Sequence, residues 1–374
     1  MGLFDFMKII ITGGGTGGHI YPGISLAKTF QKRDKNSEII FIGAEQKMES
    51  EIIPQEGFPF LGLRVRGLKR KVGLENIFTL WLFFSSLATS YRIIKEFKPD
   101  LVMGTGGYVS GSVALVSSLM GIPTFIHEQN VIPGLTNKFL SLTSRKVFTS
   151  FPESKKYFPR KNRIECLGNP VRENIWFGDR NKLIKRTSLV DQKRTILVFG
   201  GSKGASIINQ TFLECLDLID GSLWKEWQVL IISGKENSND LKRKVNNSKY
   251  KEIIYITSYL HHIEDAYALA DLVICRAGAT TIAELTAKGM AAILIPYPYA
   301  TGNHQLYNAR YLENKLAAIV IPEGELSKKR LADELSALML DQAKRDLLTQ
   351  NSKNIGNHEA AQDIVSSVYN ALKK

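Results

Sequence analysis

The sequence has few cysteines and little that would build a metal site. Its 374 residues include only three cysteines, Cys166, Cys215 and Cys275. They lie too far apart in the chain for a disulfide framework or a close-set metal motif, and this pattern indicates a reducing compartment. No Asp-x-Asp pair occurs anywhere in the chain.

A long uninterrupted apolar segment is also missing. The uncharged run 101–126 has the length of a membrane span, but glycines interrupt it early, and a glycine and a proline interrupt it late. A strand, a glycine loop, a buried helix and a second strand explain this run better. The first residues lack the pattern of a signal peptide, and both Met1 and Met7 fit as the start of the chain.

Acidic residues are outnumbered by basic ones. The chain has 49 Lys and Arg against 36 Asp and Glu, a formal net charge of +13. This charge favours an anionic partner, such as nucleic acid, an acidic membrane or a phosphorylated substrate. No recognisable nucleic-acid-binding module is present, so we expect no nucleic-acid partner.

Short β-rich runs alternate with helical patterns along the whole chain, from 8–12 to 317–321. This alternation predicts parallel sheets covered by helices on both faces, an α/β doubly wound fold. The charged segment 172–194 has no sustained apolar period, and we interpret it as a linker. After it, 194–212 repeats the strand, glycine loop and helix of the N-terminus. We therefore expect two Rossmann-like domains that face a cleft.

The first glycine loop contains Gly13, Gly15 and Gly18, which match G-x-G-x-x-G after a strand. This motif is typical of dinucleotide-binding enzymes, although Glu45 lies farther along than the acid of that motif should. His19 follows in the first turn of the expected helix, where an imidazole can accept a proton from a hydroxyl group. A dinucleotide site has no evident need for it, and a histidine without chemistry is the plain alternative.

Three more clusters follow expected strands. The loop 104–111 and the sequence 127–130, HEQN, belong to the first half, where tight packing and buried polar groups are the alternatives. Loops at the carboxyl ends of neighbouring strands would form one anion-binding surface. In the second half, 275–285 leads into a helix whose Glu284 can bridge the hydroxyls of a ribose, or can simply favour the helix dipole.

Together, GGGTGGHIYP, GTGGYVSG, HEQN, GNPVR, GGSKGA and AGATTIAEL resemble the MurG family of glycosyltransferases, and they span nearly the whole chain. The resemblance implies a GT-B fold. Residues 1–172 would form an acceptor- and membrane-binding domain, and 173–356 a domain for the UDP-sugar donor. A C-terminal helix at about 357–374 would pack back on the first domain.

The resemblance also implies the reaction. N-acetylglucosamine would move from UDP-N-acetylglucosamine to the 4-hydroxyl of undecaprenyl-pyrophosphoryl-N-acetylmuramyl-pentapeptide, lipid I, with inversion, to give lipid II for peptidoglycan. Helix N-termini and loop amides can bear the charge of the departing UDP, so we expect no cofactor and no protein-held metal. The alternatives are a GT-B transferase with another lipid acceptor and an NAD(P)-dependent oxidoreductase.

Roles for single residues follow from the same resemblance. His19 is the expected base, with Glu128 as the alternative base or orienting partner. This sequence has His304 where some relatives have a second glutamine. The expected donor-binding residues are Thr16, Gly17, Gly18, Asn130, Arg172, Ser202, Leu260, Ala279, Thr280, Thr281, Ile282, Ala283, Glu284 and Gln305. The expected contacts to the acceptor pyrophosphate are Gly14, Gly15, Gly104, Thr105, Gly106, Gly107 and Tyr108.

The segment 64–84 joins a basic cluster to an apolar helix. This pattern is typical of a helix that lies on an anionic membrane, although such residues can also pack on a sheet. With the resemblance, it predicts a peripheral protein on the cytoplasmic face of the bacterial inner membrane, with cell-wall synthesis and division proteins as further partners. The residues expected to contact the membrane are Lys69, Arg70, Lys71, Leu74, Ile77, Phe78, Trp81 and Phe84.

Overall fold

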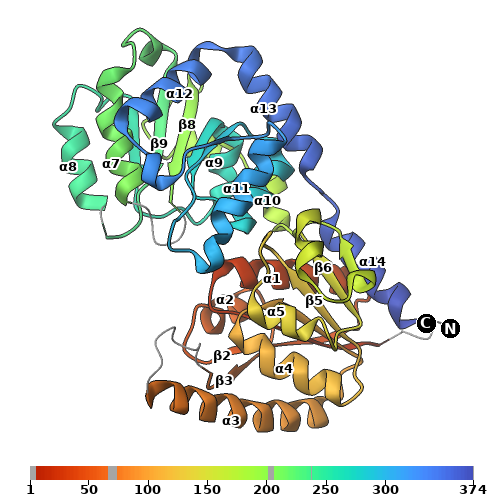
Figure 1. Ribbon diagram of the computed structural model, residues 1–374. Coiled ribbons are helices and arrows are strands. Elements are labelled where there is room, and N and C mark those ends of the chain that lie inside the picture. Colours follow the sequence, from red (N-terminus) through yellow and green to blue (C-terminus); the bar gives the residue numbers. More distant parts are fainter. Residues whose placement is uncertain (1–5, 66–73, 201–205, 237, 374) are drawn as a thin grey trace. The chain divides into compact units, whose positions relative to one another are not determined.

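The computed structural model describes residues 6–65, 74–200, 206–236 and 238–373, and for residues 74–80 it describes the backbone only. The chain forms two compact units (Figure 1). The first comprises Met1–Arg172 with Asn357–Lys374, and the second comprises Glu173–Gly356.

The first unit is built on a seven-stranded parallel sheet in the order β3-β2-β1-β4-β5-β6-β7. The middle of β1 is a run of isoleucines that are fully buried, as expected for a parallel strand covered on both faces. Ile10 pairs with Ile40 of β2 and with Val102 of β4. The strands are β1 (Lys8–Gly13), β2 (Glu38–Ala44), β3 (Phe60–Leu63), β4 (Leu101–Gly106), β5 (Thr124–Glu128), β6 (Lys146–Thr149) and β7 (Ile164–Cys166).

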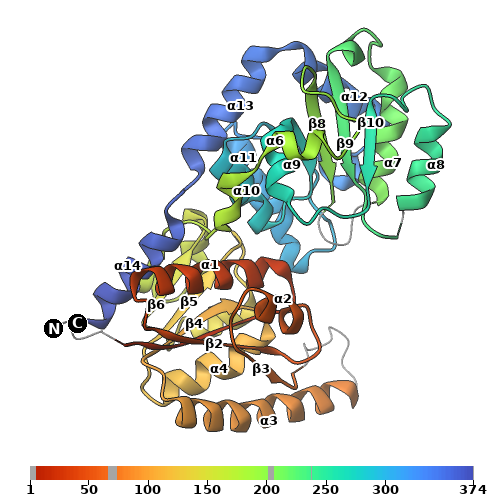
Figure 2. The same ribbon diagram turned by 180° about the vertical axis from the view of Figure 1, so that it is seen from behind.

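The helices of the first unit include one from the far end of the chain. Ile364, Val365 and Val368 of α14 pack in the same core cluster as Phe30 of α1, and the two helices lie side by side (Figure 2). The helices are α1 (Gly17–Arg33), α2 (Glu49–Gln55), α3 (Leu74–Phe97), α4 (Tyr108–Leu119), α5 (Leu135–Leu140) and α14 (Ala360–Leu372), with short 3-10 helices η1 (Pro152–Tyr157) and η2 (Lys161–Arg163).

The second unit has a six-stranded parallel sheet in the order β10-β9-β8-β11-β12-β13. Its strands are β8 (Arg194–Phe199), β9 (Trp227–Ile232), β10 (Ile254–Thr257), β11 (Ala270–Cys275), β12 (Ala292–Leu294) and β13 (Ile319–Val320). Its α-helices are α6 (Arg180–Ile184), α7 (Ser206–Cys215), α8 (Ser238–Asn246), α9 (Ile263–Leu269), α10 (Ala279–Lys288), α11 (His304–Asn314), α12 (Lys328–Leu340) and α13 (Gln342–Ile355). Its 3-10 helices are η3 (Glu173–Phe177), η4 (Leu216–Leu218), η5 (Leu223–Lys225), η6 (Thr301–Asn303) and η7 (Glu323–Glu325).

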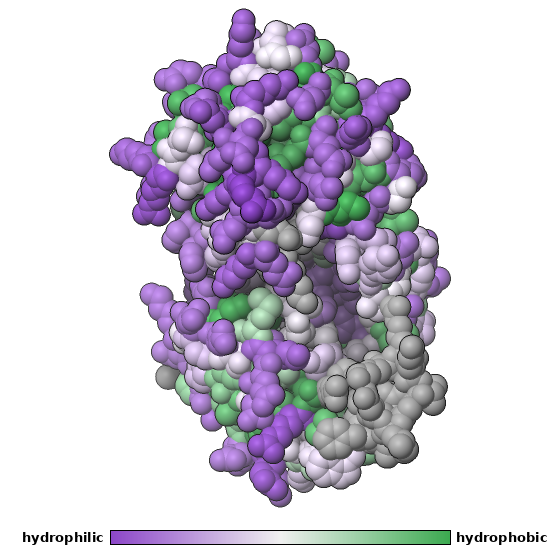
Figure 3. All heavy atoms as spheres, turned by 90° about the vertical axis from the view of Figure 1, so that its left-hand side faces the viewer, coloured by the Kyte–Doolittle hydropathy of each residue, from purple (hydrophilic) through white to green (hydrophobic). Residues whose placement is uncertain are grey.

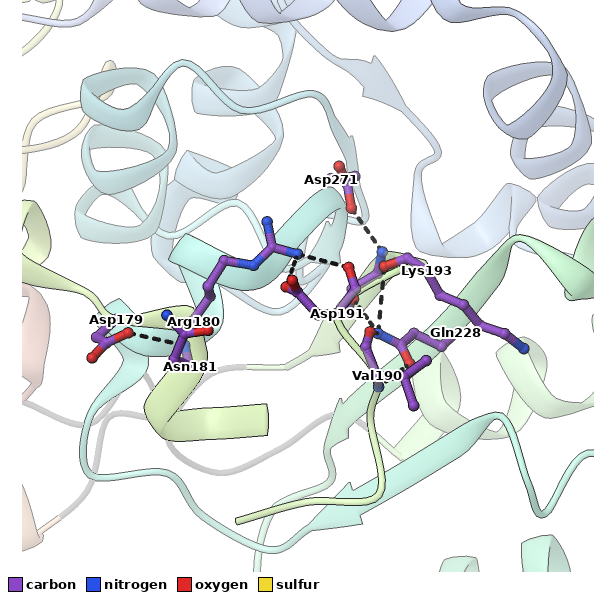
Figure 4. A network of polar contacts seen from close by, with 9 residues as sticks. Asp179, Arg180, Asn181, Val190, Asp191, Lys193, Gln228 and Asp271 are labelled. Carbon is purple, nitrogen blue, oxygen red and sulfur yellow. Dashed lines mark hydrogen bonds and ion pairs between the residues drawn. The ribbon is translucent and has the colours of Figure 1, made fainter. Parts of the chain in front are cut away.

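The interpretation of 172–194 as a linker was wrong. The segment forms η3 and α6 and buries Ile175, Leu183 and Leu189 in the second unit. Polar contacts hold it to the sheet: the side-chain amide of Gln228 donates to Val190 O (2.8 Å), and Gln228 Oε1 accepts from Val190 N (2.9 Å) (Figure 4). The segment has a weak apolar period because hydrogen bonds between its backbone and the side-chain amide of Gln228 help to attach it to the sheet.

Strand order reverses once in each sheet. In the first unit the chain winds outward from β1 on one side and from β4 on the other, and in the second unit the same reversal lies between β8 and β11. In open α/β sheets, ligands bind beyond the carboxyl ends of the strands at such a switch point. The glycine clusters that the sequence singles out follow these four strands.

Candidate active site

The two glycine loops of the first unit pack backbone against backbone at the switch point. Gly14 N donates to Gly106 O (3.2 Å). A Cβ on Gly107, whose φ is +85°, would lie 2.4 Å from Gly14 O, and a Cβ on Gly13 would lie 2.0 Å from Thr105 Oγ1. Only glycine permits this approach. The two loops therefore meet at this edge of the sheet, as expected, while anion binding by them stays a prediction.

A buried carboxylate lies beneath the first loop. Glu49 of α2 is fully buried, and its Oε1 accepts from Gly15 N (3.1 Å) and Ala44 N (3.0 Å). The amide hydrogens of Gly14 and Gly15 are thus engaged within the protein. A contact of Gly14 and Gly15 with the acceptor pyrophosphate stays a prediction, and in this arrangement neither amide has a free hydrogen to donate to it. Glu49 was not predicted as a site residue, because it lies outside every cluster recognised in the sequence.

Tyr108 begins α4 beside this carboxylate. A Cβ on Gly15 would lie 3.7 Å from its Cε1. Burial raises the pKa of Tyr108, and the negative charge of Glu49 raises it further. The phenol therefore keeps its proton at neutral pH and can act as a hydrogen-bond donor. Gly104, at the start of the same glycine cluster, lies within β4 and pairs with Ile126 of β5.

His19 lies half-buried in the first turn of α1, with its ring against Gly106. Its Nδ1 is 3.0 Å from Thr105 O and 3.0 Å from Gln129 Oε1. Because a carbonyl oxygen can only accept, Nδ1 carries the hydrogen of the neutral ring and Nε2 carries the lone pair. Nε2 has no hydrogen-bond partner among the residues that the structure describes. The ring is thus arranged as a proton acceptor.

Two buried side chains of the HEQN sequence stand behind His19. Gln129 Nε2 donates to Thr105 O (2.7 Å) and to His127 Nδ1 (3.0 Å), and His127 Nε2 donates to Gly168 O (3.0 Å). Burial lowers the pKa of His127 to about 4, so its ring is neutral at pH 7. No role was predicted for either residue, although both belong to the HEQN cluster.

Glu128 organises the loop that follows β5. Its Oε1 accepts from Asn130 N (3.0 Å) and Asn130 Nδ2 (3.2 Å), and its Oε2 accepts from Gly134 N (3.1 Å) and Asn137 Nδ2 (2.8 Å). The side chain that contacts His19 is Gln129, so the orienting role that we expected of Glu128 is corrected.

The remaining expected residues of the first unit lie around this centre. Thr16 is exposed and precedes α1, while Gly17 and Gly18 form its first turn, where backbone amides lack intrahelical acceptors. The guanidinium of Arg172 lies over the ring of Tyr21 on the same helix, 4.5 Å from its centroid. These groups place several donors near the N-terminus of α1.

The switch point of the second unit carries the other cluster. Glu284 of α10 is buried, and its Oε2 accepts from Tyr267 OH (3.0 Å). Thr280 Oγ1 is buried without a partner among the described residues. Ala279 and Ile282 are buried, so contacts from these two residues would come from their backbone, while Thr281 and Ala283 are half-buried.

Loops from neighbouring strands surround the start of α10. Gln305 Oε1 accepts from Tyr297 N (3.0 Å), and Asn308 Nδ2 donates to Ala277 O (3.4 Å), which ties α11 to the turn before α10. His304 Nδ1 bonds to Thr301 O (2.8 Å). Leu260 is half-buried in the loop between β10 and α9. Ser202 lies outside the described residues.

The expected membrane helix is α3. Trp81 is 62% exposed and Phe84 is 64% exposed, and α3 packs on α4. Apolar side chains also reach the surface in the lower half of Figure 3, which shows the first unit. Lys69, Arg70 and Lys71 lie outside the described residues, as do the side chains of Leu74, Ile77 and Phe78.

Two features are absent from the part of the chain that the structure describes. None of its helices combines the length and the apolar character that crossing a bilayer requires. None of its His, Cys, Asp and Glu side chains gather in groups of three or more that could hold a metal ion.

Comparison with known proteins agrees with this geometry. Residues 9–149 match the glycosyltransferase family 28 N-terminal domain, and residues 195–368 match the family 28 C-terminal domain. A curated UDP-N-acetylglucosamine--N-acetylmuramyl-(pentapeptide) pyrophosphoryl-undecaprenol N-acetylglucosamine transferase from Thermoanaerobacter sp. (strain X514) is 43% identical over 360 residues, 96% of this chain and 98% of the relative. The chain belongs to the MurG family of glycosyltransferases.

Further MurG proteins are similar to this chain in sequence and in structure. The relative of the same name from Acetivibrio thermocellus is 40% identical over 367 residues, 98% of this chain and 99% of the relative. The crystal structure of Acinetobacter baumannii MurG has a TM-score of 0.77 at 25% identity, covering 97% of this chain and 99% of that one. The predicted GT-B architecture and the predicted family are thereby confirmed, and the chain is a glycosyltransferase that uses a UDP-sugar donor.

Proposed function

We propose that this chain transfers N-acetylglucosamine from UDP-N-acetylglucosamine to the 4-hydroxyl of lipid I and so makes lipid II for peptidoglycan. The printed names of the MurG relatives describe this transfer. The observation that carries the proposal is the contact of His19 Nδ1 with two oxygen acceptors, Thr105 O and Gln129 Oε1, which leaves Nε2 as the nitrogen that can accept a proton. A base in this state is what an acceptor hydroxyl requires.

The reaction is a single displacement. The 4-oxygen of the acceptor forms a bond to C1 of the sugar while the bond from C1 to the phosphate oxygen breaks, and that electron pair leaves with UDP. The proton of the hydroxyl passes to His19 Nε2. Because one displacement inverts the configuration at C1, an α-linked donor gives a β-linked product.

In the second unit, Glu284 would accept hydrogen bonds from the two hydroxyls of the donor ribose. The N-terminus of α10, with Thr280 and Thr281, would bear the negative charge of the departing UDP. Gln305 would contact the sugar, and Leu260 the uracil through its backbone. In the first unit, Thr16, Gly17 and Gly18 would contact the donor sugar, and the Tyr108 hydroxyl would donate a hydrogen bond to the pyrophosphate of the acceptor.

Glu49 argues against the dinucleotide alternative. In a dinucleotide-binding domain, the amides of the glycine loop face a pyrophosphate. Here Gly15 N donates to the carboxylate of Glu49. A pyrophosphate at that amide would find its hydrogen already donated to Glu49. It would also be repelled by the negative charge of this buried carboxylate.

The membrane role of α3 belongs to the same proposal. The acceptor carries a polyprenyl chain, so the enzyme has to reach a bilayer surface. Trp81 and Phe84 are large apolar side chains exposed on one helix, and exposed groups of this kind favour insertion at an interface. We place the protein on the cytoplasmic face of the bacterial plasma membrane, where its donor is found, and as a neighbour of other cell-wall synthesis and division proteins.

The decisive experiment is transfer of labelled N-acetylglucosamine to a short-chain lipid I by the native protein and by His19→Ala. We expect native activity, and a loss of at least about a hundredfold in the variant with unchanged UDP affinity, as for removal of a general base. Activity that persists in the variant would remove His19 from the chemical step. Tight UDP binding without transfer by the native protein would mean that the acceptor is wrong.

A further inference from the structure

A chain of hydrogen bonds runs from His19 into the interior of the first unit. It passes through Gln129 to His127 and ends on the backbone oxygen of Gly168. We propose that Gln129, held in turn by His127, is a positioning residue that acts together with Thr105 O to fix His19 in the tautomer with its proton on Nδ1. The inference rests on the proposed role of His19 as the base.

The amide of Gln129 can take only one orientation. Its Nε2 is 2.7 Å from Thr105 O, and a carbonyl oxygen has no hydrogen to donate. Reversing the amide would bring two oxygens to that separation. Gln129 Oε1 is therefore the atom that faces His19 Nδ1, and it must accept from it.

The state of His127 is fixed by the same reasoning from the other end. Its Nε2 faces Gly168 O and therefore carries the hydrogen, which leaves Nδ1 to accept the second hydrogen of Gln129 Nε2. A protonated His127 would turn a second N–H toward Gln129. Burial opposes this, since it holds the pKa of His127 at about 4.

Every donor along the chain thus points away from the reacting end. Gln129 and His127 are almost fully buried, so water does not compete for these bonds. Gly106 completes the arrangement, because a Cβ there would lie 2.8 Å from His19 Nδ1 and push the ring away. When His19 takes a proton on Nε2, Gln129 Oε1 remains to stabilise the imidazolium.

The test combines kinetics with a direct reading of the tautomer. The chain has six histidines, so ¹⁵N-histidine labelling gives a small spectrum in which the His19 signals are those lost in His19→Ala. In the native protein we expect His19 to show a protonated Nδ1 and an unprotonated Nε2. This reading requires no substitution in the site.

Gln129→Met keeps the length and removes both hydrogen-bonding groups. We expect kcat to fall by about tenfold to a hundredfold, the range found when a residue that orients a functional histidine is lost. The KM for UDP-N-acetylglucosamine should not change. Nε2–H signals should appear for His19. Gln228→Met is the matched control, since Gln228 is an equally buried glutamine in the other unit. It should lower stability and leave kcat and the tautomer as they are.

The outcomes separate this inference from the proposed function. Native-level transfer by His19→Ala would overturn the base itself. If His19→Ala is inactive, an Nε2–H tautomer in the native protein would overturn the positioning role. So would a folded Gln129→Met variant whose kcat and tautomer match those of Gln228→Met.

Discussion

Substitution of Gly107 by alanine tests whether the two glycine loops hold each other in place. The new Cβ would lie 2.4 Å from Gly14 O, which is backbone and cannot rotate away. The residue also has φ +85°, which costs a non-glycine residue about 1–2 kcal/mol. The loops would have to separate. This removes the hydrogen bond from Gly14 N to Gly106 O, which costs about 1 kcal/mol. It also adds about 1–2 kcal/mol of strain.

Gly121→Ala is the matched control. Gly121 has φ +79°, in the turn after α4, and nothing lies within 4 Å of its added Cβ. It should therefore cost only the backbone term of about 1–2 kcal/mol. The sum for Gly107→Ala is about 3–5 kcal/mol.

Thermal unfolding of the full chain measures the difference. A loss of 1 kcal/mol lowers Tm by about 2–4 °C for a domain of 150–250 residues, so Gly107→Ala should lower the Tm of the first unit by roughly two to three times as much as Gly121→Ala. Transfer activity should fall only for Gly107→Ala, because His19 rests on the neighbouring Gly106. Equal shifts for the two variants would refute the claim that the loops touch.

Three further predictions concern binding, the membrane and pH. Glu284→Gln should weaken UDP-sugar binding about tenfold to a hundredfold in calorimetry, because hydrogen bonds to a charged group contribute about 1.5–3 kcal/mol; an unchanged Kd would exclude the ribose contact. Replacing Trp81 and Phe84 by serine should reduce binding to anionic vesicles and leave UDP binding intact, and unchanged vesicle binding would contradict the membrane role of α3. The pKa of His127 in the folded protein is about 4, below the ordinary value of 6.5. As the pH drops from 6.5 toward 4, the unfolded chain therefore binds a proton before the folded protein does, and the free energy of unfolding should fall. The loss approaches about 3 kcal/mol, and His127→Gln should show a shallower decline in urea unfolding over this range; parallel declines would be evidence against it.

The fold could be predicted from the sequence because its signals are local. A buried parallel strand is a run of β-branched residues such as Ile9, Ile10 and Ile11, and the turn after it needs glycine, so both features appear in neighbouring letters. The segment 172–194 was misread for the converse reason. Its contacts are made by backbone groups and by Gln228, which lies in another part of the chain.

The clusters recognised in the sequence also contain the residues that lie at the two switch points. The hydrogen-bond partners of those residues could not be predicted from it. His19 and Gln129 are 110 positions apart, and Gly15 and Glu49 are 34 apart. Glu49 lies among polar neighbours that look like ordinary surface residues, and nothing in HEQN itself indicates which of its side chains reaches His19. Only the order of strands in the sheet, which no short stretch of sequence encodes, brings them together.

Glu49 shows why the glycine motif alone could not decide between ligands. G-x-G-x-x-G specifies a turn tight enough to expose backbone amides after a strand. It does not specify what accepts their hydrogens, and here a carboxylate from α2 accepts the one from Gly15. The same turn is then free of a dinucleotide's pyrophosphate and serves to seat His19 against Gly106. The chemistry at this loop therefore follows from the residue that accepts from the turn and from the histidine that comes after it.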